Sequence, residues 1–261
     1  MDVMDIMLCK IAIPSLSRST ILIDRTLKLV LEHGIEPSDI YVFIIASEYD
    51  EYRAAISDKN INLITGLKGI AEQRGFISNF FNEGQYILTL DDDIKSISEL
   101  NNGKLEPLFS LNAINNKVFN LIEKGGTCGI YPCSNPFFMK YYNSTNLKFV
   151  IGCCRWFIND REIETSRKYT LLEDYEISLK YFLKYGKIHR LNHICADHDF
   201  NGKLAGGLAS ITDRSYQEKE KEVESFYNKY KDYCGINQRQ LKTGSKIDIK
   251  FRKMRKVNFI I

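Results

Sequence analysis

The sequence has 261 residues, of which 44% are hydrophobic and 26% charged, a balance that is ordinary for a soluble globular protein. No uninterrupted apolar run approaches the ~20 residues that a membrane-spanning helix needs, so we expect no transmembrane segment and no membrane partner. The formal net charge of +3 is small, but it is unevenly placed along the chain.

The N-terminus and the cysteines indicate the compartment. The opening stretch MDVMDIMLCKIAIP has two early aspartates and no basic leader, so it reads as a first strand and not as a signal peptide. The chain has seven cysteines, an odd number, without paired CxxC spacing, which argues against a structural zinc site. We therefore infer a reducing compartment.

The first hundred residues alternate between strand and helix patterns. Apolar, β-rich runs occupy residues 8–13, 40–46, 61–64 and 86–90. Helix patterns occupy the intervening residues 19–33, 47–56 and 69–81. This alternation predicts a parallel, doubly wound sheet that binds ligands at the carboxyl ends of its strands.

The second half has a more mixed pattern. Ser96-x-x-Glu99 resembles a capping box but leads only to a Gly/Asn-rich turn, whereas Thr170-x-x-Glu173 opens an amphipathic helix. The expected helices cover residues 107–124, 170–185 and 214–233. The expected strands cover residues 127–131, 148–157 and 187–196. The predicted fold is α/β, with a mostly parallel sheet, flanking helices and a small antiparallel extension.

Three consecutive aspartates, Asp91, Asp92 and Asp93, directly follow the predicted strand at residues 86–90. Successive side chains of an extended chain point to opposite sides, so Asp91 and Asp93 would share one side and Asp92 would face the other. Two carboxylates on one side can hold a divalent cation that keeps positions open for phosphate oxygens. The alternative is a polar loop in which Asp93 caps the next helix, but three adjacent acids repel one another without a cation.

A second acidic group, Glu173 and Asp174, stands at the start of a predicted helix. A carboxylate there can act as a general base on a hydroxyl. Acids in a first helical turn also interact favourably with the helix dipole, which is the structural alternative. Glu173 has the capping-box role, so Asp174 is the freer of the two.

Further candidates lie near the predicted strand ends. His198 follows a strand in a glycine-rich loop, where it can complete a metal site, and Gly206 and Gly207 allow that loop to close over phosphates. Arg18 follows the first strand and Arg74 precedes the aspartates, and arginine suits phosphate through its fork of donors. Each has a structural alternative: an oriented histidine, a mobile turn or a surface ion pair.

Basic residues are concentrated near the C-terminus. The segment from Arg239 to Lys256 contains eight Lys/Arg and one Asp, so it carries a net charge of +7 while the rest of the chain carries −4. A basic terminal segment on a slightly acidic body suggests an anionic partner. The alternative is a solvated or disordered end.

The motifs occur in the order typical of a GT-A glycosyltransferase. Within that fold, IPSLSRS, YILTLDDDI, LLEDYEISLKYFLKYG and ADHDFNGKLAGG resemble the glycosyltransferases associated with TET/JBP dioxygenases, relatives of the base J glucosyltransferase, which modify hydroxymethylated pyrimidines in DNA. The similarity covers roughly residues 8–215 and does not reach past residue 238. It implies one GT-A domain at residues 1–235, followed by a basic segment at residues 236–261.

The resemblance also implies a chemistry. A Mn²⁺ or Mg²⁺ ion would be held by Asp91, Asp93 and His198. The ion would neutralise the nucleotide diphosphate that leaves the sugar donor, and the expected donor is UDP-glucose. Asp174, or Glu173, would deprotonate the acceptor hydroxyl, which predicts inversion. The implied donor-binding residues are Pro14, Ser15, Arg18, Gln73, Arg74, Asp92, Gly206 and Gly207.

The implied acceptor is the hydroxymethyl group of a modified cytosine or uracil in DNA, either flipped out of a duplex or single-stranded. The implied location is the cytoplasm of a bacterial or phage-infected cell, or the nucleus of a eukaryotic cell. The candidates for contacts with the DNA backbone are Lys250, Arg252, Lys253 and Arg255. The candidates for stacking on a base are Phe137, Phe138, Trp156 and Phe157.

Three other functions stay open. The first is a GT-A glycosyltransferase that acts on a glycan, a lipid or another small acceptor. The second is a nucleotidyltransferase, although the loop at residues 14–19 lacks the glycines that such enzymes usually carry there. The third is a non-catalytic nucleic-acid-binding protein, against which the two intact acidic groups argue.

Overall fold

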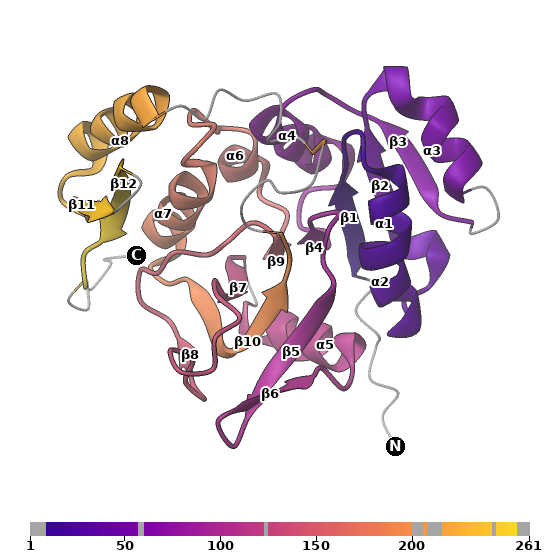
Figure 1. Cartoon of the computed structure of the whole chain (residues 1–261), viewed down its shortest axis with the longest axis horizontal. Helices are drawn as coiled ribbons and strands as arrows, with labels where there is room; N and C mark the ends of the chain where they lie inside the picture. Colours follow the sequence, from indigo (N-terminus) through magenta and orange to yellow (C-terminus); the bar gives the residue numbers. More distant parts are fainter. Residues whose placement is uncertain are drawn as a thin grey trace.

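The computed structural model describes residues 9–56, 60–122, 125–199, 206–207, 216–241 and 244–254. Within these ranges, a ten-stranded sheet carries helices on both faces, and a two-stranded antiparallel sheet lies at one end of the molecule (Figure 1). No helix in the described ranges has the length and apolar character needed to cross a membrane. The prediction of an α/β fold with flanking helices and a small antiparallel extension is confirmed.

The first half of the sheet is parallel. Its strands are β1 (Lys10–Pro14), β2 (Ile40–Ile44), β3 (Asn62–Thr65) and β4 (Tyr86–Leu90), in the order β3-β2-β1-β4. Ile11 of β1 is opposite Ile40 of β2 and Leu88 of β4. The inner strands are apolar on both faces because helices cover both faces of such a sheet.

The helices of this half are α1 (Ser19–Leu22), the π-helical turn η1 (Ile23–Leu27), α2 (Lys28–Glu32), α3 (Tyr49–Ile56) and α4 (Ile70–Phe80). Single turns of 3₁₀-helix, η2 (Pro37–Asp39) and η3 (Ala46–Glu48), precede and follow β2. Alternation along β1 sends Ile11 and Ile13 into one core with Leu22, and Ala12 into another with Ile77. The site lies where these strands end.

The second half of the sheet is mixed. Its strands are β5 (Ser96–Asn101), β6 (Lys104–Pro107), β7 (Thr127–Tyr131), β8 (Asn143–Ser144), β9 (Cys154–Ile158) and β10 (His189–Asp197). The order continues from β4 as β9-β7-β10-β5-β6, and β8 pairs with β10. The β7–β10 pair is parallel, and the other pairs are antiparallel.

The hairpin formed by β5 and β6 is absent from the sequence prediction, which assigns this stretch to a turn. Asn102 and Gly103 have positive φ angles of 47° and 78°, as the tight turn of a two-residue hairpin requires. Helix α5 (Leu111–Leu121) therefore starts later than expected, after Pro107 has ended β6. The Ser110 hydroxyl caps it by accepting a 3.2 Å hydrogen bond from the amide of Ala113.

The remaining helices are α6 (Arg161–Glu164), α7 (Glu173–Tyr185) and α8 (Tyr216–Tyr230). Gly186, with φ +69°, ends α7 as predicted. The predicted capping box at the start of α7 is wrong, because the Glu173 carboxylate forms ion pairs with Arg74 and Arg167. Instead Glu222 of α8 accepts hydrogen bonds from the amides that precede α7, at Thr170, Leu171 and Leu172.

Part of the basic C-terminal segment is folded. Strands β11 (Cys234–Leu241) and β12 (Gly244–Phe251) form the antiparallel two-stranded sheet, beside α8 in Figure 1. Ile247 and Ile249 of β12 are buried in a cluster with residues of α7 and α8. The expected domain boundary after residue 235 thus falls inside β11, and the alternative of a solvated end does not apply to β12.

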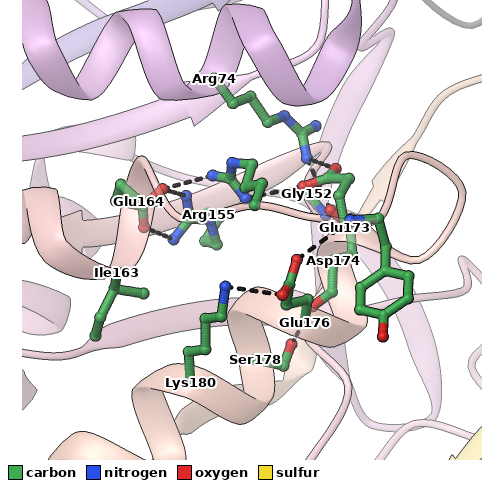
Figure 2. Close-up of polar contacts among 12 residues, drawn as sticks. Arg74, Gly152, Arg155, Ile163, Glu164, Glu173, Asp174, Glu176, Ser178 and Lys180 are labelled. Carbon is green, nitrogen blue, oxygen red and sulfur yellow. Dashed lines mark hydrogen bonds and ion pairs between the residues drawn. The ribbon is translucent and has the colours of Figure 1, made fainter. Parts of the chain in front are cut away.

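A buried ion pair joins β9 to α6. Arg155 and Glu164 make two hydrogen bonds of 2.7 and 2.9 Å, and Arg167 adds a third to Glu164 (Figure 2). Burial raises the pKa of Glu164, but Arg155 and Arg167 outweigh that effect and lower it below its ordinary value. Glu164 is therefore ionised at neutral pH and compensates two buried cations.

We expect Glu164→Ala to lower the free energy of unfolding by about 3–5 kcal/mol, because it leaves buried guanidinium groups unpaired. The stabilisation by Glu164 is present above the ordinary pKa of a glutamate and is lost as the pH falls through the lowered folded-state pKa, so the deficit shrinks in acid. Urea denaturation at several pH values measures it. The matched control is Glu162→Ala on the same helix, whose side chain is 82% exposed and whose loss costs less than about 1 kcal/mol. Equal losses for both variants would contradict the prediction.

Candidate active site

A cavity of about 320 Å³ opens where β1 and β4 end and where α4, α7 and α8 approach them. It brings together most of the residues that the sequence singles out. The predicted residues that line it are Pro14, Arg18, Arg74, Asp91, Asp92, Asp93, Glu173, Asp174 and Gly207. The two acidic groups, at least 80 positions apart in the sequence, thus face one space.

The aspartates do not continue the extended conformation of β4. The strand ends at Leu90, and Asp92 and Asp93 form a turn. Arg18 Nη1 lies 3.1 Å from Asp92 Oδ1 and 3.3 Å from Asp93 Oδ2, so these two carboxylates share one guanidinium. Asp91 instead lies 3.1 Å from Arg74 Nη2. The alternation that led us to separate Asp92 from Asp91 and Asp93 does not apply, because Asp92 and Asp93 lie in a turn and all three aspartates line the same cavity.

Asp92 has both a hydroxyl group and a guanidinium group as partners of its carboxylate. The Ser15 hydroxyl donates a 2.7 Å hydrogen bond to Asp92 Oδ2 and lies 2.7 Å from the hydroxyl of Tyr52. Burial raises the pKa of Asp92 to about 6, although Ser15 and Arg18 oppose the rise. Ser15, itself buried, thus supports Asp92 and is not among the residues that line the cavity.

Arg74 of α4 links the two acidic groups. Its buried guanidinium contacts Asp91 at 3.1 Å. It also contacts Asp174 at 2.7 Å, and Glu173 (Figure 2). Burial opposes the positive charge, but the carboxylates outweigh burial and raise the pKa of Arg74 above its ordinary value. Arg74 is therefore a fixed cation at the centre of the site.

Glu173 and Asp174 differ in their surroundings. Burial raises the pKa of Glu173 above its ordinary value, although Arg74 and Arg167 oppose the rise. Burial would also raise the pKa of Asp174, but Arg74, Glu173 and the amide of Gly152 outweigh it, so the pKa of Asp174 is lowered. The amide of Gly152 donates to Asp174 Oδ2 at 2.9 Å. Asp174 is thus the carboxylate that stays ionised, and its side chain is 24% exposed against 8% for Glu173.

The other predicted donor-binding residues lie at the edge of the site or behind it. Gln73 is fully buried, and its Oε1 accepts a 2.6 Å hydrogen bond from the amide of Leu67, so it orders the loop after β3. The amide of Gly207 donates to the carbonyl of Leu16 at 2.7 Å. A Cβ atom at Gly207 would lie 2.6 Å from Arg18 Cζ, so this position lets the backbone pass close to the guanidinium. Gly206 packs in the same way against the carbonyl of Ser17.

Two of the three proposed metal ligands, Asp91 and Asp93, line the same cavity. Burial and Asp91 raise the pKa of Asp93, whereas His198 and Arg18 lower it. Asp93 Oδ1 is buried and has no hydrogen-bond partner within the described residues. No group of three or more ligand-type side chains in those residues is arranged around one point. Two carboxylates fit a hard cation such as Mg²⁺, which takes one or two protein ligands together with phosphate and water.

Sequence reasoning missed several residues of the cavity wall. Lys219 of α8 lines it and lies 3.5 Å from Asp248 of β12. Nothing distinguishes Lys219 from its neighbours in a helix with many charged residues. Thr170 and Leu171, in the loop before α7, and Ile70, at the start of α4, also line the cavity, and adjacency to the recognised motifs is the signal that could have found them.

The proposed DNA-contacting residues lie apart from this cavity. Lys250, Arg252 and Lys253 are exposed at the end of β12 and beyond it, and they line a second, larger groove. Arg255 lies outside the described residues. Trp156 and Phe157 are buried in the core, so the expectation that they stack on a base is wrong.

The strand order and the acidic turn after β4 are those of a GT-A-like fold. No protein-family model matches the chain, and no curated protein matches it by sequence. Glucosyl-3-phosphoglycerate synthase from Mycobacterium tuberculosis, solved with Mn²⁺, UDP and glucosyl-3-phosphoglycerate, is similar in structure. The TM-score is 0.53 at 9% identity, over 95% of this chain and 88% of that one.

A second structure of that enzyme, with Mg²⁺ and UDP, gives the same TM-score of 0.53 at 9% identity and covers the same shares, 95% and 88%. The 4-diphosphocytidyl-2C-methyl-D-erythritol synthase from Anaerococcus prevotii DSM 20548 has a TM-score of 0.44 at 12% identity, over 87% of this chain and 100% of that one. At these identities the similarity shows the fold alone.

We expect Asp93→Ala to weaken Mn²⁺ binding at least tenfold, or about 1.4 kcal/mol, because the proposed site loses one of its two carboxylate ligands. Electron paramagnetic resonance titration in the presence of UDP measures the free Mn²⁺. The control is Asp24→Ala, an exposed aspartate on η1, which should bind Mn²⁺ as the parent does. Unchanged affinity in a folded Asp93→Ala protein would exclude Asp93 as a ligand.

Proposed function

We propose that the protein is a metal-dependent, inverting glycosyltransferase that moves a sugar, glucose in the first instance, from a nucleotide-sugar to a hydroxyl acceptor. One observation carries the proposal. The acidic turn after β4 and the ionised Asp174 face each other across one cavity, with Arg74 between them. A nucleotide-sugar needs cations around its diphosphate and a base near its anomeric carbon, and this cavity offers both.

The donor end of the cavity is formed by the acidic turn and two arginines. In the proposal Asp91 and Asp93, with His198 nearby, hold Mn²⁺ or Mg²⁺. The ion supplies the charge neutralisation that a leaving diphosphate requires. Arg18 and Arg74 now pair with the carboxylates, and their forks of donors suit the same phosphate oxygens. Asp92, fixed by Ser15, is the proposed contact for the sugar or ribose.

The acceptor end is formed by the first turn of α7. Asp174 stays ionised because Arg74 and the amide of Gly152 hold its negative charge, so it can accept the proton of an acceptor hydroxyl. Glu173 lies between Arg74 and Arg167 and is the less exposed of the two. We therefore assign Asp174 as the base and Glu173 as the residue that orients Arg74. Attack from the side opposite to the diphosphate gives inversion.

For the acceptor we propose the hydroxymethyl group of a modified pyrimidine in DNA. The motif resemblance and the basic residues of the C-terminal hairpin support this choice. A pyrimidine within a duplex is out of reach of such a cavity, so the base must be flipped or presented on a single strand. A small anionic acceptor is the second candidate, because the similar synthase was solved with glucosyl-3-phosphoglycerate and because Lys219 lines the cavity.

We expect Asp174→Asn to lower the transfer rate by roughly 10²–10⁴-fold, the range associated with loss of a general base. The side chain keeps its shape, so UDP affinity measured by calorimetry should change little. Asp232→Asn, an exposed change beyond α8, should leave the rate unaltered. Transfer at the parental rate by Asp174→Asn would exclude Asp174 as the base.

The acceptor is tested by a screen with radiolabelled UDP-glucose and other nucleotide-sugars. We expect label on DNA that contains hydroxymethylcytosine or hydroxymethyluracil, and none on unmodified DNA. Label on 3-phosphoglycerate or on a glycan, with none on modified DNA, would instead support the small-acceptor candidate. Hydrolysis of the donor in the absence of an acceptor reports on the donor site alone.

A further inference from the structure

A groove of about 820 Å³ lies between the segment 142–149 and the end of β12. Tyr175, in the first turn of α7, forms part of its lining, and the preceding residue, Asp174, lines the active-site cavity. The groove and the cavity are therefore lined by consecutive residues at the start of one helix. Asn146 Nδ2 donates a 2.8 Å hydrogen bond to the carbonyl of Met254, which joins the two walls of the groove.

The groove has an uncompensated positive charge. Its lining contains five cationic side chains and no acidic one: Lys148, Arg190, Lys250, Arg252 and Lys253. Within the described residues none of the five makes a salt bridge. Burial lowers the pKa of Lys148, and Arg190 and Lys253 lower it further, which shows that these charges crowd one another. Such a concentration of like charge favours an anionic ligand.

Aromatic rings accompany these charges. The ring centroids of Phe149 and Tyr175 are 4.3 Å apart, and those of Tyr175 and Phe251 are 5.5 Å apart. Tyr142 lines the groove and is 54% exposed. The exposed rings of Phe137, Phe138 and Tyr141 precede it in the sequence. Because Phe149, Tyr175 and Phe251 pack against one another, Tyr142 is the groove ring that is exposed for stacking with a nucleic-acid base.

We propose that this groove binds a single-stranded nucleic-acid segment, with its phosphates at Lys148, Lys250 and Lys253 and a base against Tyr142. The inference rests on the proposed function, because it supplies the path by which an acceptor strand reaches Asp174. Arg252 has a different part, since its Nε donates to the carbonyls of Lys231 and Cys234 and thereby fixes the end of the hairpin.

The test is fluorescence anisotropy with the full chain and a labelled, unmodified single-stranded oligonucleotide, without donor or metal. Lys250 and Lys253 are exposed, so a Lys250→Glu/Lys253→Glu protein should fold. We expect its affinity to fall at least tenfold, and the slope of log affinity against log salt to decrease by roughly 1.4, about 0.7 for each lost phosphate contact. The control, Lys28→Glu/Lys104→Glu, has the same net charge and changes exposed lysines elsewhere.

Tyr142→Ala tests the stacking contact, and we expect a loss of roughly tenfold in affinity for the oligonucleotide with none for polyphosphate. Equal affinity of the groove variant and the charge control would overturn the proposal, and so would a Tyr142→Ala protein that binds the oligonucleotide as the parent does. Preference for a duplex over a single strand would also contradict it.

Hydrolysis of the donor distinguishes a failure of the groove proposal from a failure of the proposed enzymatic function. The groove variants should hydrolyse UDP-glucose as the parent does, because they change no residue of the cavity. Groove-dependent binding without any donor hydrolysis by the parent would support the groove and reject the proposed enzyme. Donor hydrolysis without groove-dependent binding would support the proposed enzyme and reject the groove as the nucleic-acid site.

Discussion

The candidate active site depends on the burial of one guanidinium among acids from distant parts of the chain. Arg74 contacts Asp91 after β4 and both acids at the start of α7, so it fixes the separation between the two acidic groups. Removal of any one partner changes the charge balance of the others, because all of them lie in a region of low dielectric. Arg18 does the same for Asp92 and Asp93. Arg18 and Arg74 together contact five acidic side chains that line the cavity.

Much of this arrangement could be predicted from the sequence, because local patterns determine it. Apolar runs of four or five residues gave the parallel strands, and ligand-bearing loops gather at the carboxyl ends of such strands. The placement of Asp91 and Asp174 in one cavity followed from motif order, by resemblance to GT-A glycosyltransferases. Sequence periodicity gave the helix that carries Arg74 but not its ion pairs, because the partners of a buried charge are chosen by tertiary packing.

The sequence predictions were wrong where contacts between distant parts of the chain determine the structure and the local sequence pattern does not. The alternation rule failed at Asp92, where the chain turns and Ser15 and Arg18 hold the carboxylate. The capping box failed because Glu173 has partners with more charge than a backbone amide. The strands β6 and β12 were missed because they carry many charged residues. Pairing with β5 stabilises β6, and β12 is stabilised by pairing with β11 and by burial of its isoleucines against α7 and α8. Lys219 reaches the site from a helix whose sequence gives no sign of it.

The absence of a side chain at Gly152 bears directly on the ion pair between Arg74 and Asp174. A Cβ atom there would overlap both the Arg74 guanidinium and the Asp174 carboxylate, so even alanine displaces one of them. The overlapping atoms belong to the ends of two side chains, so a methyl group at residue 152 would act by shifting the ion pair and not by moving the backbone. The missing side chain at this position is thus what allows Arg74 and Asp174 to approach each other beside the backbone of residue 152.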